Sequence, residues 1–267
     1  MSLEATTEQT NPVLEPIEWE PPMPPTDLIF DDGEPLESNR HRVAMNVLIR
    51  SLNQGWSDRQ DFFAGGNMFV YYSSSQARNR DFRGPDFFAV LGVEADSSRQ
   101  GWVVWEEGGR YPDVIVEMLP PSTTNVDLGA KKTLYEQVFR TRDYFVYDPF
   151  DPSAFQGWHL DLDQGYQPIP VNEQGWRWCQ TLELWLGSWS GAVDIDTTTW
   201  LRFYDRNGNL VPLPEEAERQ RADEQHQRAN EQQQRADEER QRADEERQRA
   251  DRLAVRLREL GEDPDRG

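Results

Sequence analysis

A seven-residue repeat in the C-terminal part of this chain constrains its folding more than any other feature of the sequence. From Glu215 onward the motif Arg-Ala-Asp-Glu and close variants recur, and alanines stand one heptad apart at positions 222, 229, 236, 243 and 250. These residue types favour helix, and glutamates four residues before arginines add ion pairs along its surface. Because the repeat has too few apolar residues to form a core, residues 215–267 are predicted to form a charged helix.

The composition of the repeat leaves two interpretations of this helix open. Three residues after each alanine stands a glutamine or a glutamate, and only the last heptad has a leucine, Leu253, at that position. A seam of alanine with Gln or Glu is a poor coiled-coil core. The helix is therefore either a solvated rod with a short leucine-rich end, or a homo-oligomerisation element over residues 215–260.

The part of the chain that precedes the repeat is long enough for one folded domain. All ten Trp, twelve Phe and eight Tyr lie there and supply the apolar area that a core needs. Residues 28–214 are predicted to form this domain, whereas residues 1–27 are rich in Pro and Glu and are predicted to be a flexible acidic arm. The single cysteine, Cys179, excludes an intrachain disulfide and a cysteine-based zinc cluster.

Hydropathy and charge limit the partners of the chain. No window approaches the ~20 apolar residues of a membrane span, and the start of the chain lacks the basic and apolar regions of a signal peptide. We therefore expect a cytoplasmic protein without a membrane partner. The net charge of −21 opposes tight, non-specific binding to DNA, because phosphate neutralisation normally dominates such affinity.

Hydrophobic periodicity predicts an α/β domain. A helix capped by Ser38 or Asn39 is expected to run to about Asn53, and a second helix to cover residues 127–140. Strands are expected at residues 67–72, 86–91, 101–105, 113–119 and 143–147, and hairpins over residues 157–211. A strand, a helix and a strand in close succession predict a parallel crossover connection. Most of the tryptophans of the hairpin region are expected to serve packing.

Two features of the sequence suggest where chemistry takes place. Only two of the 28 basic residues are lysines, Lys131 and Lys132, and both lie on the helix after the 113–119 strand. Lysine provides a compact, deprotonatable charge that arginine does not. In that strand Glu117 interrupts an apolar run, while Asp86 opens an earlier strand. A buried carboxylate needs compensation, which either a divalent cation shared by Asp86 and Glu117 or a salt bridge to an arginine would supply.

Four segments of the chain, taken together, resemble a known family. They read GPDFFAV, PDVIVEMLPPST, DLGAKKTLYEQ and DYFVYDP, and they place motif residues at Asp86, Glu117, Lys131, Tyr135 and Tyr144. This set resembles the Uma-two family of putative restriction endonucleases, within the PD-(D/E)XK nuclease superfamily. The resemblance covers roughly residues 25–215 and extends to the style of the tail. It implies a restriction-endonuclease-like mixed sheet flanked by helices, followed by C-terminal β-hairpins and the long charged helix.

The resemblance also implies a site and a reaction. Asp86 and Glu117 would bind Mg²⁺ or Mn²⁺ for phosphodiester hydrolysis in DNA, and Lys131 would assist the attacking water. Leu119 replaces the lysine of the superfamily's Glu-x-Lys motif, so the role of that lysine passes to Lys131 on the helix. Residues in supporting positions would be Tyr135, Asp127, His41 and Asp113, with Glu37 near the first helix as a further candidate.

A second interpretation belongs to a different class of protein. The acidity and the heptad tail favour a catalytically weak or inactive nuclease-like interaction module, which oligomerises or recruits partners through its tail. No Gly-rich phosphate loop is present, and no partner for a catalytic histidine can be recognised beside His41, His159 or His226. The sequence therefore does not support nucleotide binding or a Ser–His–Asp hydrolase.

Overall fold

A six-stranded mixed sheet in the order β1-β3-β5-β6-β7-β8 forms the centre of the protein. The structure, a computed structural model, describes residues 23–30, 38–79, 83–119 and 127–259, with the backbone alone at positions 127 and 128. The strands of this sheet are β1 (Phe62–Gly65), β3 (Phe87–Leu91), β5 (Val114–Met118), β6 (Asp143–Tyr147), β7 (Gln156–Asp161) and β8 (Gly165–Pro168). Only β5 and β6 pair in parallel, and the other neighbours are antiparallel.

The parallel pair has the helical crossover that the sequence predicts. The connection from β5 to β6 contains α3 (Asp127–Leu134), which continues directly into a π-helical turn, η1 (Tyr135–Phe139). Arg140 adopts a left-handed conformation with φ of 53°, and this ends the helix one residue before its predicted end. The mixed α/β fold class is thereby confirmed, and the crossover places the helix with both lysines over the sheet.

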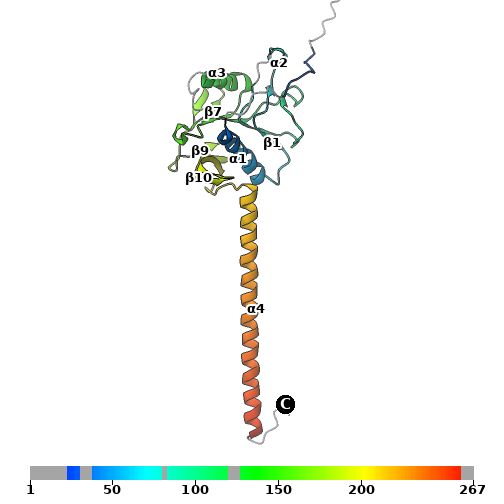
Figure 1. The fold of residues 1–267 in the computed structure, drawn as a ribbon, viewed down its shortest axis with the longest axis vertical. Helices are drawn as coiled ribbons and strands as arrows, with labels where there is room; N and C mark the ends of the chain where they lie inside the picture. The colour runs from blue at the N-terminus through cyan, green and yellow to red at the C-terminus, as the bar shows by residue number, and fades with distance from the viewer. Residues whose placement is uncertain (1–22, 31–37, 80–82, 120–126, 260–267) are drawn as a thin grey trace, which may run out of the picture.

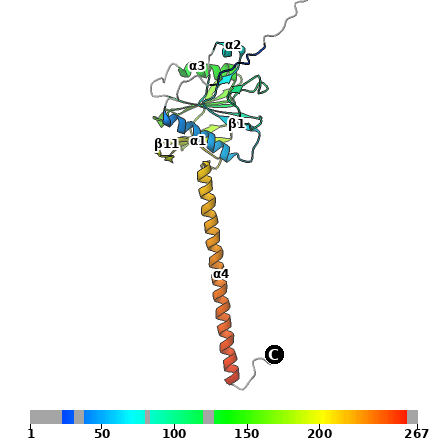
Figure 2. The same cartoon turned by 45° about the vertical axis from the view of Figure 1, so that its right-hand side comes forward.

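Two apolar layers cover opposite faces of the sheet. On one face lies α1 (Asn39–Gly55), which Ser38 caps by accepting a hydrogen bond from the His41 N–H. Because side chains alternate along β5, Val114, Val116 and Met118 join the layer on the α1 side, while Ile115 joins the layer with η1. Figures 1 and 2 show α1 and α3 on opposite sides of the sheet. Glu117 follows the alternation to the α3 side.

The α1 side also receives a second, three-stranded sheet in the order β11-β10-β9. Its strands are β9 (Arg177–Cys179), β10 (Leu184–Val193) and β11 (Asp196–Tyr204). The remaining elements are a parallel pair, β2 (Val70–Tyr71) with β4 (Trp102–Val103), and two short helices, α2 (Ser74–Arg78) and η2 (Pro152–Ala154). Trp200 on β11 is fully buried in the core, as expected of a packing tryptophan.

The strands of the structure differ from the expected ones in two places. Residues 62–65 form β1, for which the sequence predicted no strand, because pairing with β3 rather than a local pattern makes this short segment a strand. The 67–72 and 101–105 segments form only two-residue strands outside the central sheet. The hairpin of β10 and β11 lies within the expected hairpin region of residues 157–211, and nine successive cross-strand pairs hold it through residues 188–200, which include Ser, Thr and Gly.

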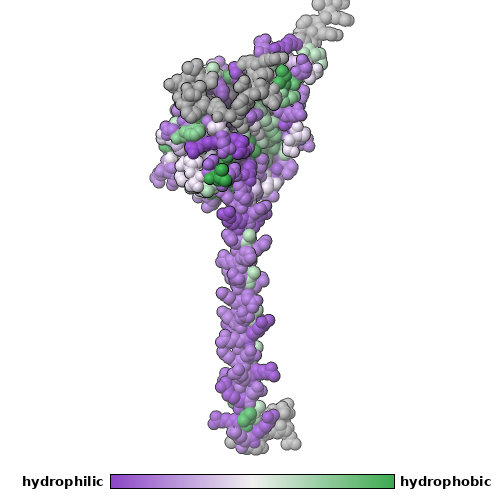
Figure 3. Space-filling model, in the orientation of Figure 1, coloured by the Kyte–Doolittle hydropathy of each residue, from purple (hydrophilic) through white to green (hydrophobic). Residues whose placement is uncertain are grey.

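The heptad repeat forms α4 (Pro214–Glu259), a 46-residue helix with no buried residue. At 1.5 Å per residue it is about 70 Å long, and it projects from the domain with a hydrophilic surface (Figures 1 and 3). Its first turn is fixed to the domain, since Glu216 accepts hydrogen bonds from both terminal nitrogens of the buried Arg202 at 2.6 and 3.2 Å. None of the helices in the described ranges is long and apolar enough to cross a membrane.

Candidate metal-binding acid site

Two carboxylates meet where β3 begins and β5 ends. Phe87 pairs with Val116 in the antiparallel register, so the next step of the ladder sets Asp86 opposite Glu117. Asp86 is partly buried, and its Oδ2 accepts a hydrogen bond from the Met118 N–H at 2.7 Å. The Glu117 side chain is only 4% exposed. The strand pairing thus joins two acids that lie far apart along the chain.

Two donors from the crossover helix hold the Glu117 carboxylate. Lys131 on α3 places its Nζ 3.1 Å from Oε2 of Glu117, and the Tyr135 hydroxyl at the start of η1 donates to Oε1 at 2.6 Å. The side chain of Lys131 is 35% exposed, so its amino group lies between the buried carboxylate and the surface. Tyr135 is fully buried. Lys131 and Tyr135, four residues apart, thus lie on the same helical face and both donate hydrogen bonds to the Glu117 carboxylate.

The electrostatics of this site are unbalanced. Burial raises the pKa of Asp86 well above its ordinary value, and the negative charge of Glu117 raises it further. The Met118 N–H and the Lys131 charge act in the opposite direction but do not cancel these two effects. Burial and then the charge of Glu117 also raise the pKa of the Tyr135 phenol, so Tyr135 remains a protonated donor. One ammonium group therefore faces two carboxylates, and the site favours an added positive charge.

The chemistry of these donors fits a hard divalent cation. Mg²⁺ is usually held by one or two carboxylates and completes its coordination with waters and substrate phosphates. The pair of Asp86 and Glu117 provides the oxygen ligands of such a site. In the described ranges, no group of three or more His, Cys, Asp or Glu side chains could hold a metal ion together. Zinc prefers closed sets of nitrogen and sulfur ligands, so a pair of carboxylates is a poor match for it.

The other residues expected to support the site lie in different places. His41 on α1 is buried, and its ring contacts the Ser38 hydroxyl at 2.8 Å and the Leu119 carbonyl at 3.3 Å, so it borders the end of β5. Asp113 lies at the opposite end of β5, where it accepts a hydrogen bond from the Leu91 N–H at 2.8 Å. Asp127 begins α3, but its side chain, like Glu37, lies outside the described residues. The structure therefore brings Tyr135 to the acid pair but not Asp113.

The positions of two groups near this site do not follow from the sequence alone. The Met118 N–H is a main-chain donor, so no residue type signals it. Tyr144 on β6 belongs to the motif set, yet only the parallel register, which pairs it with Ile115, places it on the same face as Glu117.

Lys132, the second lysine, lies over the ring of Trp158 with its Nζ 3.8 Å from the centroid. The two lysines therefore have separate environments.

A second polar cleft lies near the start of β6, away from the acid site. It has a volume of about 570 Å³ and is lined by Trp56, Arg59, Arg142, His159, Thr181 and Arg206, among others. His159 does have a partner, contrary to the sequence-based expectation, since its Nδ1 lies 2.8 Å from Oδ1 of the buried Asp143. His41 likewise contacts Ser38 and Leu119.

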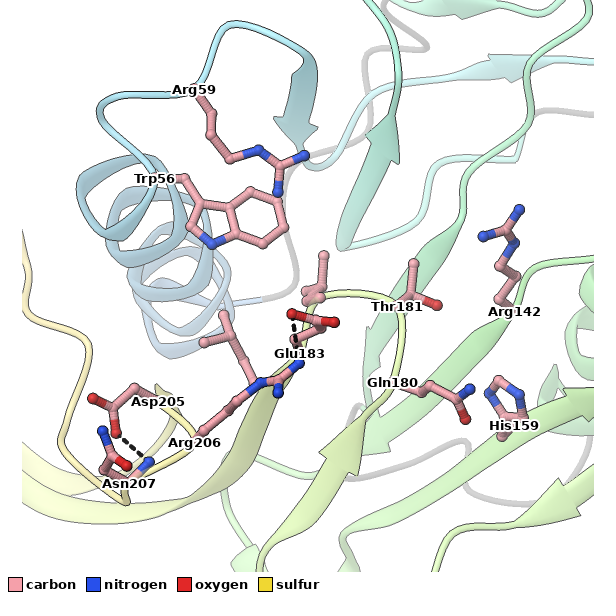
Figure 4. Close-up of a pocket in the computed structure, with 12 residues that line it drawn as sticks. Trp56, Arg59, Arg142, His159, Gln180, Thr181, Glu183, Asp205, Arg206 and Asn207 are labelled. Carbon is pink, nitrogen blue, oxygen red and sulfur yellow. Dashed lines mark hydrogen bonds and ion pairs between the residues drawn. The ribbon is translucent and has the colours of Figure 1, made fainter.

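The three arginines that line this cleft each form an ion pair, either within the cleft or with an acid beside it. Figure 4 shows Arg206 directed at Glu183, and the two form an ion pair of 2.7 Å. Arg59 pairs with Asp61 at 2.8 Å, and its guanidinium lies over the Trp56 ring. Each arginine of the cleft therefore already has an acidic partner, whereas the acid site has two carboxylates for one lysine.

Comparison with known proteins assigns the chain to a family. Residues 17–193 match the Uma2 family, described as "Putative restriction endonuclease". Because this match spans more than half of the chain, the protein belongs to the Uma2 family. A crystal structure of a putative nuclease belonging to DUF820 from Anabaena variabilis ATCC 29413 is similar, with a TM-score of 0.41 and 11% identity over 60% of this chain and 86% of that one. Among curated proteins the comparison found no match.

Proposed function

We propose that this protein is a metal-dependent endonuclease that hydrolyses phosphodiester bonds of DNA. The observation that carries this proposal is the unbalanced acid pair, in which the buried Glu117 and Asp86 face one lysine. Membership of the Uma2 family, described as "Putative restriction endonuclease", favours nucleic acid as the substrate. A cytoplasmic location, where DNA and Mg²⁺ are both present, fits this assignment.

Each residue of the site has a distinct role in the proposed reaction. Asp86 and Glu117 would hold a Mg²⁺ or Mn²⁺ ion, which when bound polarises the phosphate and lowers the pKa of a water ligand. Lys131, with its amino group near the surface, would orient the attacking water and offset the charge that develops on the phosphate. Tyr135 holds the Glu117 carboxylate in place through its 2.6 Å hydrogen bond.

Calorimetry combined with plasmid nicking tests this proposal. We expect wild-type protein to bind Mg²⁺ and to nick DNA, whereas Glu117→Gln and Asp86→Asn lose both. Asp113→Asn is the matched control, because it alters a carboxylate of the same segment at the far end of β5 and retains an acceptor for the Leu91 N–H. Nicking that survives in folded Glu117→Gln and Asp86→Asn proteins would refute the assignment.

A second function is favoured by the surface of α4. This helix has 46 residues, none buried, and its first turn is fixed to the domain, so it presents a rigid charged rod to other molecules. The alternative function is an interaction module that oligomerises through residues 215–260. A double variant, Ala229→Asp with Ala243→Asp, would then lower the mass measured by sedimentation equilibrium. An unchanged monomeric mass in both proteins would reject self-association.

A further inference from the structure

A buried tyrosine beside the acid pair has a hydroxyl without a partner. Tyr144 on β6 has no exposed surface, and its hydroxyl makes no hydrogen bond in the described part of the chain. Buried phenol groups almost always find a partner, because desolvating an unpaired hydroxyl is unfavourable. The exceptions in native structures commonly mark a functional group or a position that a ligand or water completes.

The position of Tyr144 connects it to the acid site. Parallel pairing sets Tyr144 opposite Ile115 and Val146 opposite Glu117, so Tyr144 and Glu117 lie on the same face of neighbouring strands. The Tyr144 ring meets the ring of Tyr135, the donor to Glu117, edge-on with centroids 5.4 Å apart. Burial first, and then the charge of Glu117, raise the pKa of Tyr144, so its hydroxyl keeps its proton.

The two neighbouring tyrosines show what is unusual about Tyr144. Tyr135 donates to Glu117 at 2.6 Å, and Tyr166, stacked on Tyr144 with centroids 5.9 Å apart, donates to the Thr141 carbonyl at 2.9 Å. Trp158 stacks with Tyr144 at 5.6 Å, so the ring is held between aromatic neighbours. The ring packing therefore does not need the hydroxyl, whose donor remains available to the site.

We propose that Tyr144 is a positioning residue whose hydroxyl donates a hydrogen bond to an oxygen that enters the acid site together with the divalent cation. This inference rests on the proposed metal-dependent function. The oxygen belongs either to a water of the cation or to a phosphate of the substrate, since both accept a hydrogen bond in the same way. In the cation-free protein the hydroxyl is unsatisfied, and loading the site satisfies it.

The variant Tyr144→Phe separates stability from cation binding. Because the change removes only a hydroxyl without a partner, the cation-free variant is expected to melt at the wild-type temperature or above it. Loss of one neutral hydrogen bond in the loaded site should weaken Mg²⁺ binding roughly fivefold, as measured by calorimetry. A second titration, with a short DNA duplex in Ca²⁺, identifies the acceptor. Weakening with Mg²⁺ alone indicates water, and weakening only with DNA indicates a phosphate oxygen.

Tyr166→Phe is the matched control within the same aromatic stack. Its hydroxyl is satisfied by Thr141, so this variant is expected to melt at a lower temperature and to bind Mg²⁺ as wild type does. The inference is overturned if Tyr144→Phe melts lower in the same way, or if it matches wild type in both titrations. If wild-type protein binds no divalent cation, the proposed function fails and this inference falls with it.

Discussion

Two carboxylates in this protein face basic residues in opposite electrostatic situations. At the base of α4, Glu216 accepts hydrogen bonds from both terminal nitrogens of the fully buried Arg202 and also from the Leu213 N–H at 2.7 Å. Burial alone would raise the pKa of Glu216, but the bonds from Arg202 and Leu213 hold it below its ordinary value. This arrangement is a structural ion pair, with a bidentate fork and matched charges.

The acid site also pairs carboxylates with a basic side chain, but there the negative charges outnumber the positive one. Glu117 meets a single lysine at 3.1 Å and Asp86 adds a second carboxylate, so burial and then the negative charge of Glu117 raise the pKa of Asp86. A fold that needed only stability at this point would match its charges, as it does at Glu216. The imbalance is therefore the feature that separates a candidate binding site from a structural anchor.

Breaking the anchor is expected to have the largest effect on stability. Arg202→Met leaves Glu216 beside a buried apolar side chain and should lower the free energy of unfolding by about 3 kcal/mol, because one partner of a buried pair is left alone. Urea denaturation measures this loss. Arg50→Met, which removes the exposed pair between Arg50 and Glu215, is the control and should cost less than about 1 kcal/mol. Equal losses would mean that α4 is not anchored through Arg202.

Removing a carboxylate from the acid site is expected to act in the opposite direction on stability. Asp86→Asn relieves the repulsion with Glu117, so the cation-free protein should gain about 1 kcal/mol in the free energy of unfolding. The same variant should lose DNA nicking by about 100-fold or more. Glu216→Gln serves as the comparison and should be destabilised with little loss of nicking. A destabilised Asp86→Asn protein would contradict the proposed imbalance.

Asp86 and Glu216 should make contributions of opposite sign to the pH dependence of stability. The pKa of Asp86 is raised in the folded state. The contribution of Asp86 to the free energy of unfolding is therefore fully present below the ordinary pKa of 3.8 and is lost as pH rises through the raised pKa. The pKa of Glu216 is lowered, so its contribution is present above 4.5 and is lost as pH falls through the lowered pKa.

Urea denaturation at several pH values distinguishes these two contributions. Compared with wild type, Asp86→Asn should flatten the decline of stability above pH 3.8, and Glu216→Gln should flatten the loss below pH 4.5. Mg²⁺ should remove the decline that Asp86 causes, because the cation binds the ionised carboxylate. A decline that persists unchanged in Asp86→Asn would assign it to another group.

Substitution of Lys131 is expected to change stability the least, and its comparison with Lys132 tests which lysine supports activity. Lys131→Gln removes a partly exposed ion pair and should alter the free energy of unfolding by less than about 1 kcal/mol. We expect nicking to fall strongly in Lys131→Gln and to persist in Lys132→Gln, whose lysine lies over Trp158 instead. Comparable activity in both variants would remove Lys131 from the proposed mechanism.

Much of the site could be predicted because its signals are local. The alternation of β5 places Glu117 on the opposite face from Val116, and the scarcity of lysine marks the helix that reaches it. The short β1 and the exact extent of the hairpin of β10 and β11 are harder to predict, since strand pairing rather than local composition holds those segments. The partner of His159 was missed for the same reason, because Asp143 lies on the neighbouring strand.

The sequence by itself determined the exposed helix of the heptad repeat, the α/β class, and the residue types of the acid site, because periodicity and composition act over short distances. Only the tertiary structure decided that Asp86 faces Glu117, that Tyr144 lies beside them without a partner, and that Arg202 anchors Glu216. These relations depend on hydrogen-bond register and packing between segments far apart in the chain. A single sequence does not encode such distances in any local pattern, so they appear only when the strands pair.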